Sequence, residues 1–213
     1  MDKSAKFWDR IAKGYSKQPI ADEASYQKKL QITHEYLKPD MEVLELGCGT
    51  GSTAIIHAPY VKHIRAIDIS SKMIEIAQGK ADKKKIDNIT FEILTIDDLN
   101  DQEQTLDVVL CLSILHLLEN KEEVIANIHK MLKPGGLFIS STVCLGDTMR
   151  WLKIIAPIGK LLGLMPMVKF FTKDQLRDCI VDAGFNIDKF WLTGKGKAVC
   201  IVAKKQLFNG ETS

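Results

Sequence analysis

Three glycines in five residues, at positions 47, 49 and 51, restrict what this chain can fold into more than any other feature. They follow the apolar run "VLEL" and precede "STAIIH". Glycine destabilises the interior of a strand or helix, but it adopts positive φ and lets a ligand approach the backbone closely. The pattern therefore predicts a ligand-binding turn between a buried strand at Glu42–Leu46 and a helix at Ser52–His57, whose first N–H groups are free to bind the ligand.

Strand-like and helix-like segments alternate along the chain. We predict further strands at His63–Ser70, Ile89–Leu94, Leu106–Leu112 and Leu137–Val143, and a hairpin of "FNIDKFWLTG" and "KAVCIVAKK" joined by a tight turn. We predict further helices at Ala24–Leu37, Ser71–Ala81, Lys121–Leu132 and Lys173–Ala183. This alternation predicts an α/β fold with a doubly wound, mostly parallel, seven-stranded sheet and an antiparallel C-terminal hairpin. In such a sheet, ligands bind at the carboxyl ends of the strands.

Length and composition restrict the class of protein. The 213 residues suit one domain, and a net charge of +2 gives no sign of a nucleic-acid-binding protein. The five cysteines include no C-x-x-C pair, which favours a reduced, cytoplasmic protein without a metal site. Neither a signal peptide nor an apolar run of membrane-spanning length is found in the sequence.

The glycine spacing excludes two common nucleotide-binding loops. A dinucleotide fingerprint needs G-x-G-x-x-G and a phosphate loop needs G-x-x-x-x-G-K-[ST], whereas this chain has G-x-G-x-G. An acid, Asp68, ends the second strand 17 residues after Gly51. Because a carboxylate accepts hydrogen bonds from both hydroxyls of a ribose, Asp68 is the candidate ribose ligand.

Four motifs in this order, "LELGCGTG", "AIDIS", "DVVLCLSILHLL" and "IHKMLKPGGLFIS", resemble those of the class I S-adenosylmethionine-dependent methyltransferases. More narrowly, the chain resembles the small-molecule branch that includes the ubiquinone and menaquinone methyltransferases. The resemblance extends from Phe7 to Lys204. It implies a Rossmann-like methyltransferase fold in one domain, residues 1–213, with S-adenosylmethionine as cofactor and S-adenosylhomocysteine as product.

The resemblance also implies a role for each matching residue. Glu45 would orient the glycine loop and reach the cofactor's ammonium group through water, and Asp68 would hold the ribose. The remaining implied cofactor contacts are Gly47, Cys48 and Gly49 on the methionine part, Ile69 and Met73 on the adenine, the backbone of Cys111 and Leu112 on the ammonium group, and Tyr15 of the lid motif "FWDRIAKGY". Relatives often carry Asp-Ala after the third strand, where this chain has Thr95 and Ile96; a shifted alignment places Asp97 there instead.

Two residues after the fourth strand are candidates for work on the methyl acceptor. His116 is the candidate base because its pKa suits proton transfer near neutral pH. A packing role beside the pocket is the alternative, which we favour. Ser113 could donate a hydrogen bond to the acceptor or cap the following turn.

Residues 147–171 form an apolar insertion that, by the resemblance, covers the acceptor, while residues 1–37 supply the lid and the first helices. Trp151, Ile155, Leu162 and Met165 would line the acceptor pocket. Residues 148–171 carry four basic side chains, so contact with a membrane surface is an alternative, and a dimer interface is another.

The sequence therefore predicts a methyltransferase for a small, largely apolar acceptor, working as a monomer or weak homodimer. A non-catalytic protein that binds the same cofactor, as a partner or sensor, is the alternative. A nicotinamide-dependent oxidoreductase is disfavoured by the glycine spacing.

Overall fold

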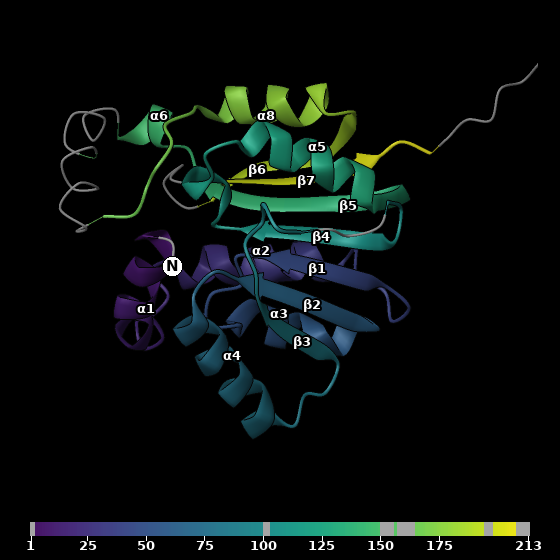
Figure 1. Ribbon diagram of the computed structural model, residues 1–213. Helices are drawn as coiled ribbons and strands as arrows, with labels where there is room; N and C mark the ends of the chain where they lie inside the picture. Colours follow the sequence, from purple (N-terminus) through teal and green to yellow (C-terminus); the bar gives the residue numbers. More distant parts are fainter. Residues whose placement is uncertain (1–2, 100–102, 150–155, 157–164, 194–197, 208–213) are drawn as a thin grey trace, which may run out of the picture.

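The apolar run at Glu42–Leu46 forms β1, an interior strand of a seven-stranded sheet (Figure 1). This computed structural model describes residues 3–99, 103–149, 156, 165–193 and 198–207. The strand order is β3-β2-β1-β4-β5-β7-β6. The other strands are β2 His63–Asp68, β3 Ile89–Ile93, β4 Leu106–Leu112, β5 Leu132–Val143, β6 Phe185–Thr193 and β7 Ala198–Lys205.

The pairing directions match the expected fold. β1 runs parallel to β2 and β4, β2 to β3, and β4 to β5. β7 is antiparallel to both β5 and β6, so the terminal hairpin inserts one strand into the sheet and leaves β6 at its edge. The predicted doubly wound sheet with an antiparallel hairpin is confirmed.

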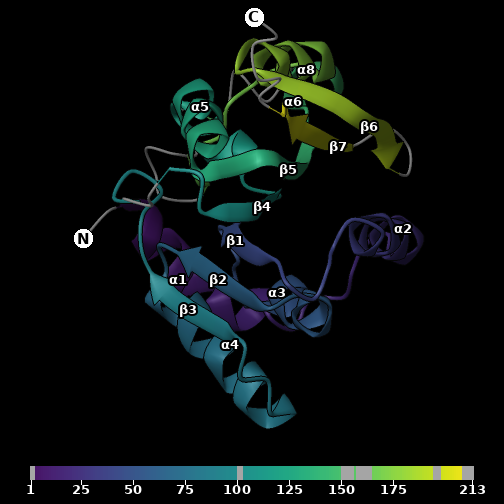
Figure 2. The ribbon, with the colours of Figure 1, turned by 90° about the vertical axis from the view of Figure 1, so that its right-hand side faces the viewer.

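Helices cover both faces of this sheet (Figures 1 and 2). They are α1 Lys3–Tyr15, α2 Glu23–His34, α3 Ser52–His57, α4 Ser71–Lys84, α5 Lys121–Met131, α6 Leu145–Thr148 and α8 Lys173–Asp182, with short 3₁₀ turns η1 Ala58–Tyr60 and η2 Leu115–Leu117. Leu44 and Leu46 of β1 pack in one cluster with α5 and α8, whereas Val43 packs in a second cluster with α3 and α4. Alternate residues of each strand thus serve two cores.

Several element bounds differ from the expectation. α2 ends at His34, not Leu37, and the chain then turns so that Tyr36 donates a hydrogen bond to Asp188 of β6. α4 continues past Ala81 to Lys84 because Lys85 adopts the left-handed conformation that ends a helix. β5 begins at Leu132, not Leu137, so that "KPGG" belongs to the strand, where the register with β4 is interrupted.

The part of the chain that the structure describes contains neither a helix able to cross a membrane nor a metal-type cluster of three acidic, His or Cys side chains. The acceptor cover expected at residues 147–171 lies largely outside the described residues.

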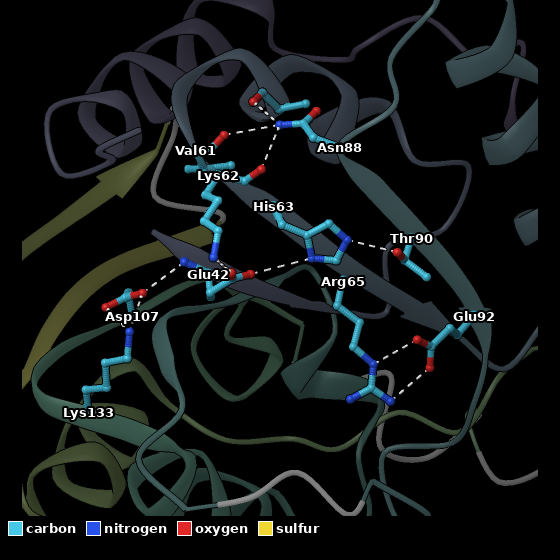
Figure 3. A network of polar contacts seen from close by, with 11 residues as sticks. Glu42, Val61, Lys62, His63, Arg65, Asn88, Thr90, Glu92, Asp107 and Lys133 are labelled. Carbon is cyan, nitrogen blue, oxygen red and sulfur yellow. Dashed lines mark hydrogen bonds and ion pairs between the residues drawn. The ribbon is translucent and has the colours of Figure 1, made fainter. Parts of the chain in front are cut away.

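Polar contacts connect neighbouring strands at and near their amino ends (Figure 3). The backbone N–H of Glu42, at the start of β1, donates to Asp107 of β4 at 2.9 Å, and Asp107 accepts from Lys133 at 2.8 Å. Arg65 of β2 forms a two-pronged ion pair with Glu92 of β3. These partly exposed contacts each contribute little, about 0–1 kcal/mol, and they join strands that backbone pairing already places side by side.

Lys205 at the end of β7 is buried, and its Nζ donates to the carbonyls of His129 and Leu132 at 2.6 and 2.7 Å. The His129 carbonyl belongs to the last turn of α5, where carbonyls lack helical partners. We predict that Lys205→Met lowers the free energy of unfolding by about 1–3 kcal/mol, because it leaves two carbonyls unsatisfied. Urea denaturation measures the change.

The neighbouring Lys204 supplies the matched control, since its Nζ reaches Asp188 and lies over the Tyr36 ring on a partly exposed surface. Lys204→Met is expected to cost less than about 1 kcal/mol. Equal losses in the two variants would contradict the capping role of Lys205.

Candidate active site

A cavity of about 950 Å³ opens at the carboxyl ends of β1, β2 and β4. This is where a doubly wound sheet binds its ligands. The lining includes these residues expected from the sequence: Tyr15, Gly47, Gly49, Asp68, Ile69, Met73, Thr95, Ile96, Leu112, Ser113 and Met165. Four expected residues, Glu45, Cys48, Cys111 and His116, lie outside it.

The three glycines of the loop are required for different reasons. All have φ between 54° and 69°, the left-handed region that disfavours other residues. A Cβ on Gly47 would lie 2.7 Å from Ile114 Cδ1, and one on Gly51 would lie 2.7 Å from Ala77 Cβ. Gly49 has more room, and its backbone is exposed to the cavity.

Asp68 joins the two turns that border the cavity. Its Oδ2 accepts the N–H of Gly49 and its Oδ1 accepts the N–H of Ser70, both at 2.9 Å. Burial raises the pKa of Asp68, and the backbone hydrogen bonds oppose that shift. Each carboxylate oxygen has a further acceptor position, so Asp68 can bind ligand hydroxyls while holding the loop.

A lysine fixes the far side of the same loop. Lys80 of α4 donates to the carbonyl and hydroxyl of Thr50, at 3.0 and 2.8 Å, and to the hydroxyl of Ser52 at 2.9 Å. The spacing to the loop is set by the fold, so no local pattern indicates this contact.

Glu45 is buried on the α2 side of β1, and its Oε2 has no hydrogen-bond partner among the described residues. Burial raises the pKa of Glu45 to about 8, and the positive charge of Lys29 on α2 opposes that shift. Glu45 does not line the cavity, and its expected contact with the ligand through water stays a prediction.

Cys48 and Cys111 are buried outside the lining, and burial raises the pKa of both thiols. Both are therefore poor nucleophiles. The side chain of Cys111 packs in the core cluster with α5 and α8, because strand residues alternate between the two faces. Leu112, the next residue, lines the cavity.

Helix α1 forms one wall of the cavity through Phe7, Trp8, Arg10 and Tyr15. The Trp8 and Tyr15 rings meet edge to face at 6.3 Å. Only Tyr15 was expected here individually. The signal for Phe7 and Trp8 lay in the same "FWDRIAKGY" motif, about two helical turns before Tyr15.

Thr95, Ile96 and Asp97 all line the cavity after β3. The Thr95 hydroxyl donates to the Asp98 carboxylate at 2.6 Å and accepts its N–H at 3.0 Å. Its side chain is thus used in a local turn. Of the three, Asp97 keeps an ionisable side chain at the cavity, as the shifted alignment proposed.

His116 packs behind the cavity. Its Nδ1 lies 3.1 Å from the Thr142 hydroxyl, its carbonyl accepts the N–H of Lys169 at 2.8 Å, and burial lowers its pKa. This placement favours the packing interpretation over the base. Ser113 does line the cavity, with φ of 67° and its N–H donating to the Ser141 carbonyl.

Apolar residues dominate the remaining wall. Met165, Pro166 and Met167 line it together with Leu117 and Leu118, and of these only Met165 was expected. Leu117 and Leu118 follow the fourth strand within "DVVLCLSILHLL", and neither was expected at the cavity. Trp151, Ile155 and Leu162, the other expected acceptor contacts, lie outside the described residues.

The signature of a methyltransferase domain matches residues 37–176, which include the glycine loop, Asp68 and the end of β4. The chain belongs to this family. The match begins after α2, so it does not include α1, although α1 forms part of the cavity wall.

Similar proteins and structures agree with this assignment. A ubiquinone biosynthesis O-methyltransferase of Rickettsia bellii is 29% identical over 155 residues, 70% of this chain and 63% of that protein. The YcgJ protein of Bacillus subtilis has a crystal structure with a TM-score of 0.70 at 15% identity, covering 84% of this chain and 99% of that chain. A methyltransferase of Haloferax volcanii, solved with the Trm112 activator, gives a TM-score of 0.74 at 14% identity, with 98% of each chain covered. The chain spans 35% to 63% of the length of the curated relatives that it matches.

The raised pKa of Glu45 in this methyltransferase domain makes a prediction about stability. A group whose pKa is raised from 4.5 to about 8 on folding stabilises the protein fully only below the lower value, and this stabilisation is lost as the pH rises through 8. Glutamine does not ionise. We therefore predict that Glu45→Gln gains stability relative to the wild type between pH 5 and 9, by a few kcal/mol, since each pKa unit corresponds to about 1.4 kcal/mol.

Denaturant unfolding of both proteins across this pH range measures the difference, and the comparison cancels the other titrating groups. A difference that stays constant with pH would show that Glu45 is charged in the folded protein at neutral pH.

Proposed function

We propose that this chain is an S-adenosylmethionine-dependent methyltransferase that acts on a small, largely apolar acceptor. The observation that supports this proposal is that one cavity has both a polar and an apolar part. Backbone of the glycine loop and the Asp68 carboxylate border one part, and leucine, methionine and proline side chains border another. A polar cofactor and an apolar acceptor would share this space.

The residues present fit the cofactor. Gly47 and Gly49 expose backbone where a side chain would otherwise project, and Asp68 retains acceptor positions suited to ribose hydroxyls. Ile69 and Met73 supply apolar surface for the adenine, and Asp97 is available to its amino group. A volume of about 950 Å³ lies at the upper end of the roughly 300–1,000 Å³ of small-molecule sites.

The chemistry assigned to the protein is mainly alignment. When bound, the cofactor would supply a methyl group on a sulfonium, which is an excellent leaving group. The chain's own residues would orient the acceptor and exclude water, among them the α1 aromatics, Leu117, Leu118 and Met167. His116, outside the cavity, is assigned no proton transfer.

The proposal extends to the setting of the enzyme. We take the acceptor to be a small molecule, not a nucleic acid, and the protein to be a cytoplasmic monomer or weak homodimer. The net charge of +2 and the five free cysteines support this reading. The same cavity would serve a non-catalytic binder of the cofactor, so binding and turnover must be measured separately.

The decisive experiment combines calorimetry with an acceptor screen. S-adenosylhomocysteine and S-adenosylmethionine should bind, and NAD should not. Labelled cofactor is then incubated with phenols, catechols, amines and thiols that carry apolar groups. Transfer to an acceptor supports the enzyme, binding without transfer to any class supports the sensor, and NAD binding alone would reject both.

Asp68→Ala should weaken S-adenosylhomocysteine binding by about 1.5–3 kcal/mol, at least tenfold, because charge-assisted hydrogen bonds are lost. Calorimetry measures the change, and circular dichroism checks the fold. Asp107→Ala is the matched control: Asp107 also accepts a backbone N–H, but at the opposite ends of the strands. An unchanged affinity in a folded Asp68 variant would show that this residue does not hold the ribose.

His116→Asn should lower turnover by less than about threefold and keep the shape of the pH–rate profile, because the ring contacts Thr142 and not the cavity. Thr142→Val, which removes that contact from the other side, should have a similar effect. A loss of about a hundredfold, with disappearance of one limb of the profile, would instead identify His116 as the base.

A further inference from the structure

Helix α1 packs against α4, and the two helices lie side by side in both views of the molecule (Figures 1 and 2). Ala5, Asp9 and Ala12 recur at helical spacing on α1, and both alanines are buried. Small residues allow two helices to approach closely. The one larger side chain between them is therefore placed to make a specific contact.

That side chain is Asp9, and it binds the N-terminus of α4 from outside the helix. Its Oδ1 accepts the hydroxyl of Ser70 at 2.7 Å, the backbone N–H of Lys72 at 3.0 Å and the hydroxyl of Ser71 at 3.5 Å. The first four N–H groups of a helix have no partner within it, and a negative charge is stabilised there. The hydrogen bonds from Ser70 and Lys72 lower the pKa of Asp9, so the carboxylate is charged at neutral pH.

Ser70 connects Asp9 to the cavity through further hydrogen bonds. Its hydroxyl also caps α4 by accepting the N–H of Met73 at 3.1 Å, and its own N–H donates to Asp68 at 2.9 Å. Asp68 in turn holds Gly49. One continuous chain of hydrogen bonds thus runs from α1 through the buried Ser70 to the glycine loop.

The residues on either side of Asp9 are part of the cavity wall. Phe7, Trp8 and Arg10 line it, whereas Asp9 does not. Since Asp9 points to α4, its hydrogen bonds set where its neighbours stand relative to the cavity. Asp9 therefore acts on the cavity through these neighbouring side chains and not by direct contact.

We propose that Asp9 is a positioning residue: it holds α1 in place as the cavity wall and, through Ser70, orients Asp68 toward the cofactor. The second half of this statement rests on the proposed function. The first half concerns the protein alone and is testable without any ligand.

The experiment compares Asp9→Ala and Asp9→Asn with Asp22→Ala as a matched control. Asp22 is also a helix cap that accepts a backbone N–H and a serine hydroxyl, from Ser25, but it caps α2 and lies outside the cavity lining. Hydrogen–deuterium exchange of the unliganded proteins reports how firmly each helix is held. Calorimetry with S-adenosylhomocysteine reports the cofactor site, and thermal unfolding checks that each variant is folded.

Asp9→Ala should speed exchange in residues 3–15 by about tenfold and weaken S-adenosylhomocysteine binding by a similar factor, as loss of charge-assisted hydrogen bonds implies. Asp9→Asn keeps an accepting oxygen. It should therefore retain most of the protection against exchange in residues 3–15 and most of the affinity for S-adenosylhomocysteine. Asp22→Ala should speed exchange in residues 23–34 and leave the binding constant within twofold of the wild type.

Unchanged exchange in residues 3–15 of Asp9→Ala would overturn the proposed anchoring of α1. Faster exchange with unchanged affinity would overturn the link to the cofactor and leave a purely structural contact. If the wild type binds no S-adenosylhomocysteine, the proposed function and the cofactor half fail together, while the exchange data still decide whether Asp9 holds the wall.

Discussion

The carboxylate of Asp68 is the interaction on which the rest of the site depends. A loop whose three glycines adopt left-handed φ has few internal restraints, and it needs an outside acceptor to fix its N–H groups. Asp68 supplies that acceptor from the neighbouring strand, binding Gly49 and Ser70 at once. Burial of a charge is unfavourable, and these two hydrogen bonds offset part of that cost. The Asp68 side chain therefore fixes the loop, holds the residue that precedes α4 and borders the space for the ligand.

The sheet separates structural tasks from binding tasks along its strands. Near the amino ends, contacts such as Asp107 with Lys133 join neighbours without forming a cavity. At the carboxyl ends, the connections diverge, and helix starts and turns leave room for a ligand. Lys80 and Asp9 reach this end from α4 and α1, so the site is fixed by elements that contribute no backbone to the sheet.

Local patterns predicted the strands, the glycine loop and Asp68, because each depends on nearby sequence: an apolar run, a positive φ or a fixed offset along the chain. They did not predict Lys80 as a loop anchor or Leu117 and Met167 as wall, because those roles follow from tertiary placement. Cys48 and Cys111 lie outside the lining, and their thiols are buried in the protein. The contact expected of Cys111 was through its backbone, so both ligand contacts stay predictions. The α2 boundary was missed for a similar reason: the chain leaves the helix to bring Tyr36 to β6.

The contact between Asp9 and Ser70 joins residues 61 positions apart, and this separation has a consequence for synthesis on the ribosome. At about 5–20 residues per second, α1 leaves the ribosome roughly 3–12 seconds before its docking partner. During that interval Phe7 and Trp8 have no sheet or helix to cover them, and a helix of 13 residues is marginal on its own. Since the cavity lining continues to Met167, the cavity is completed only after most of the chain has been made, and its aromatic wall is available to chaperones before it is available to a ligand.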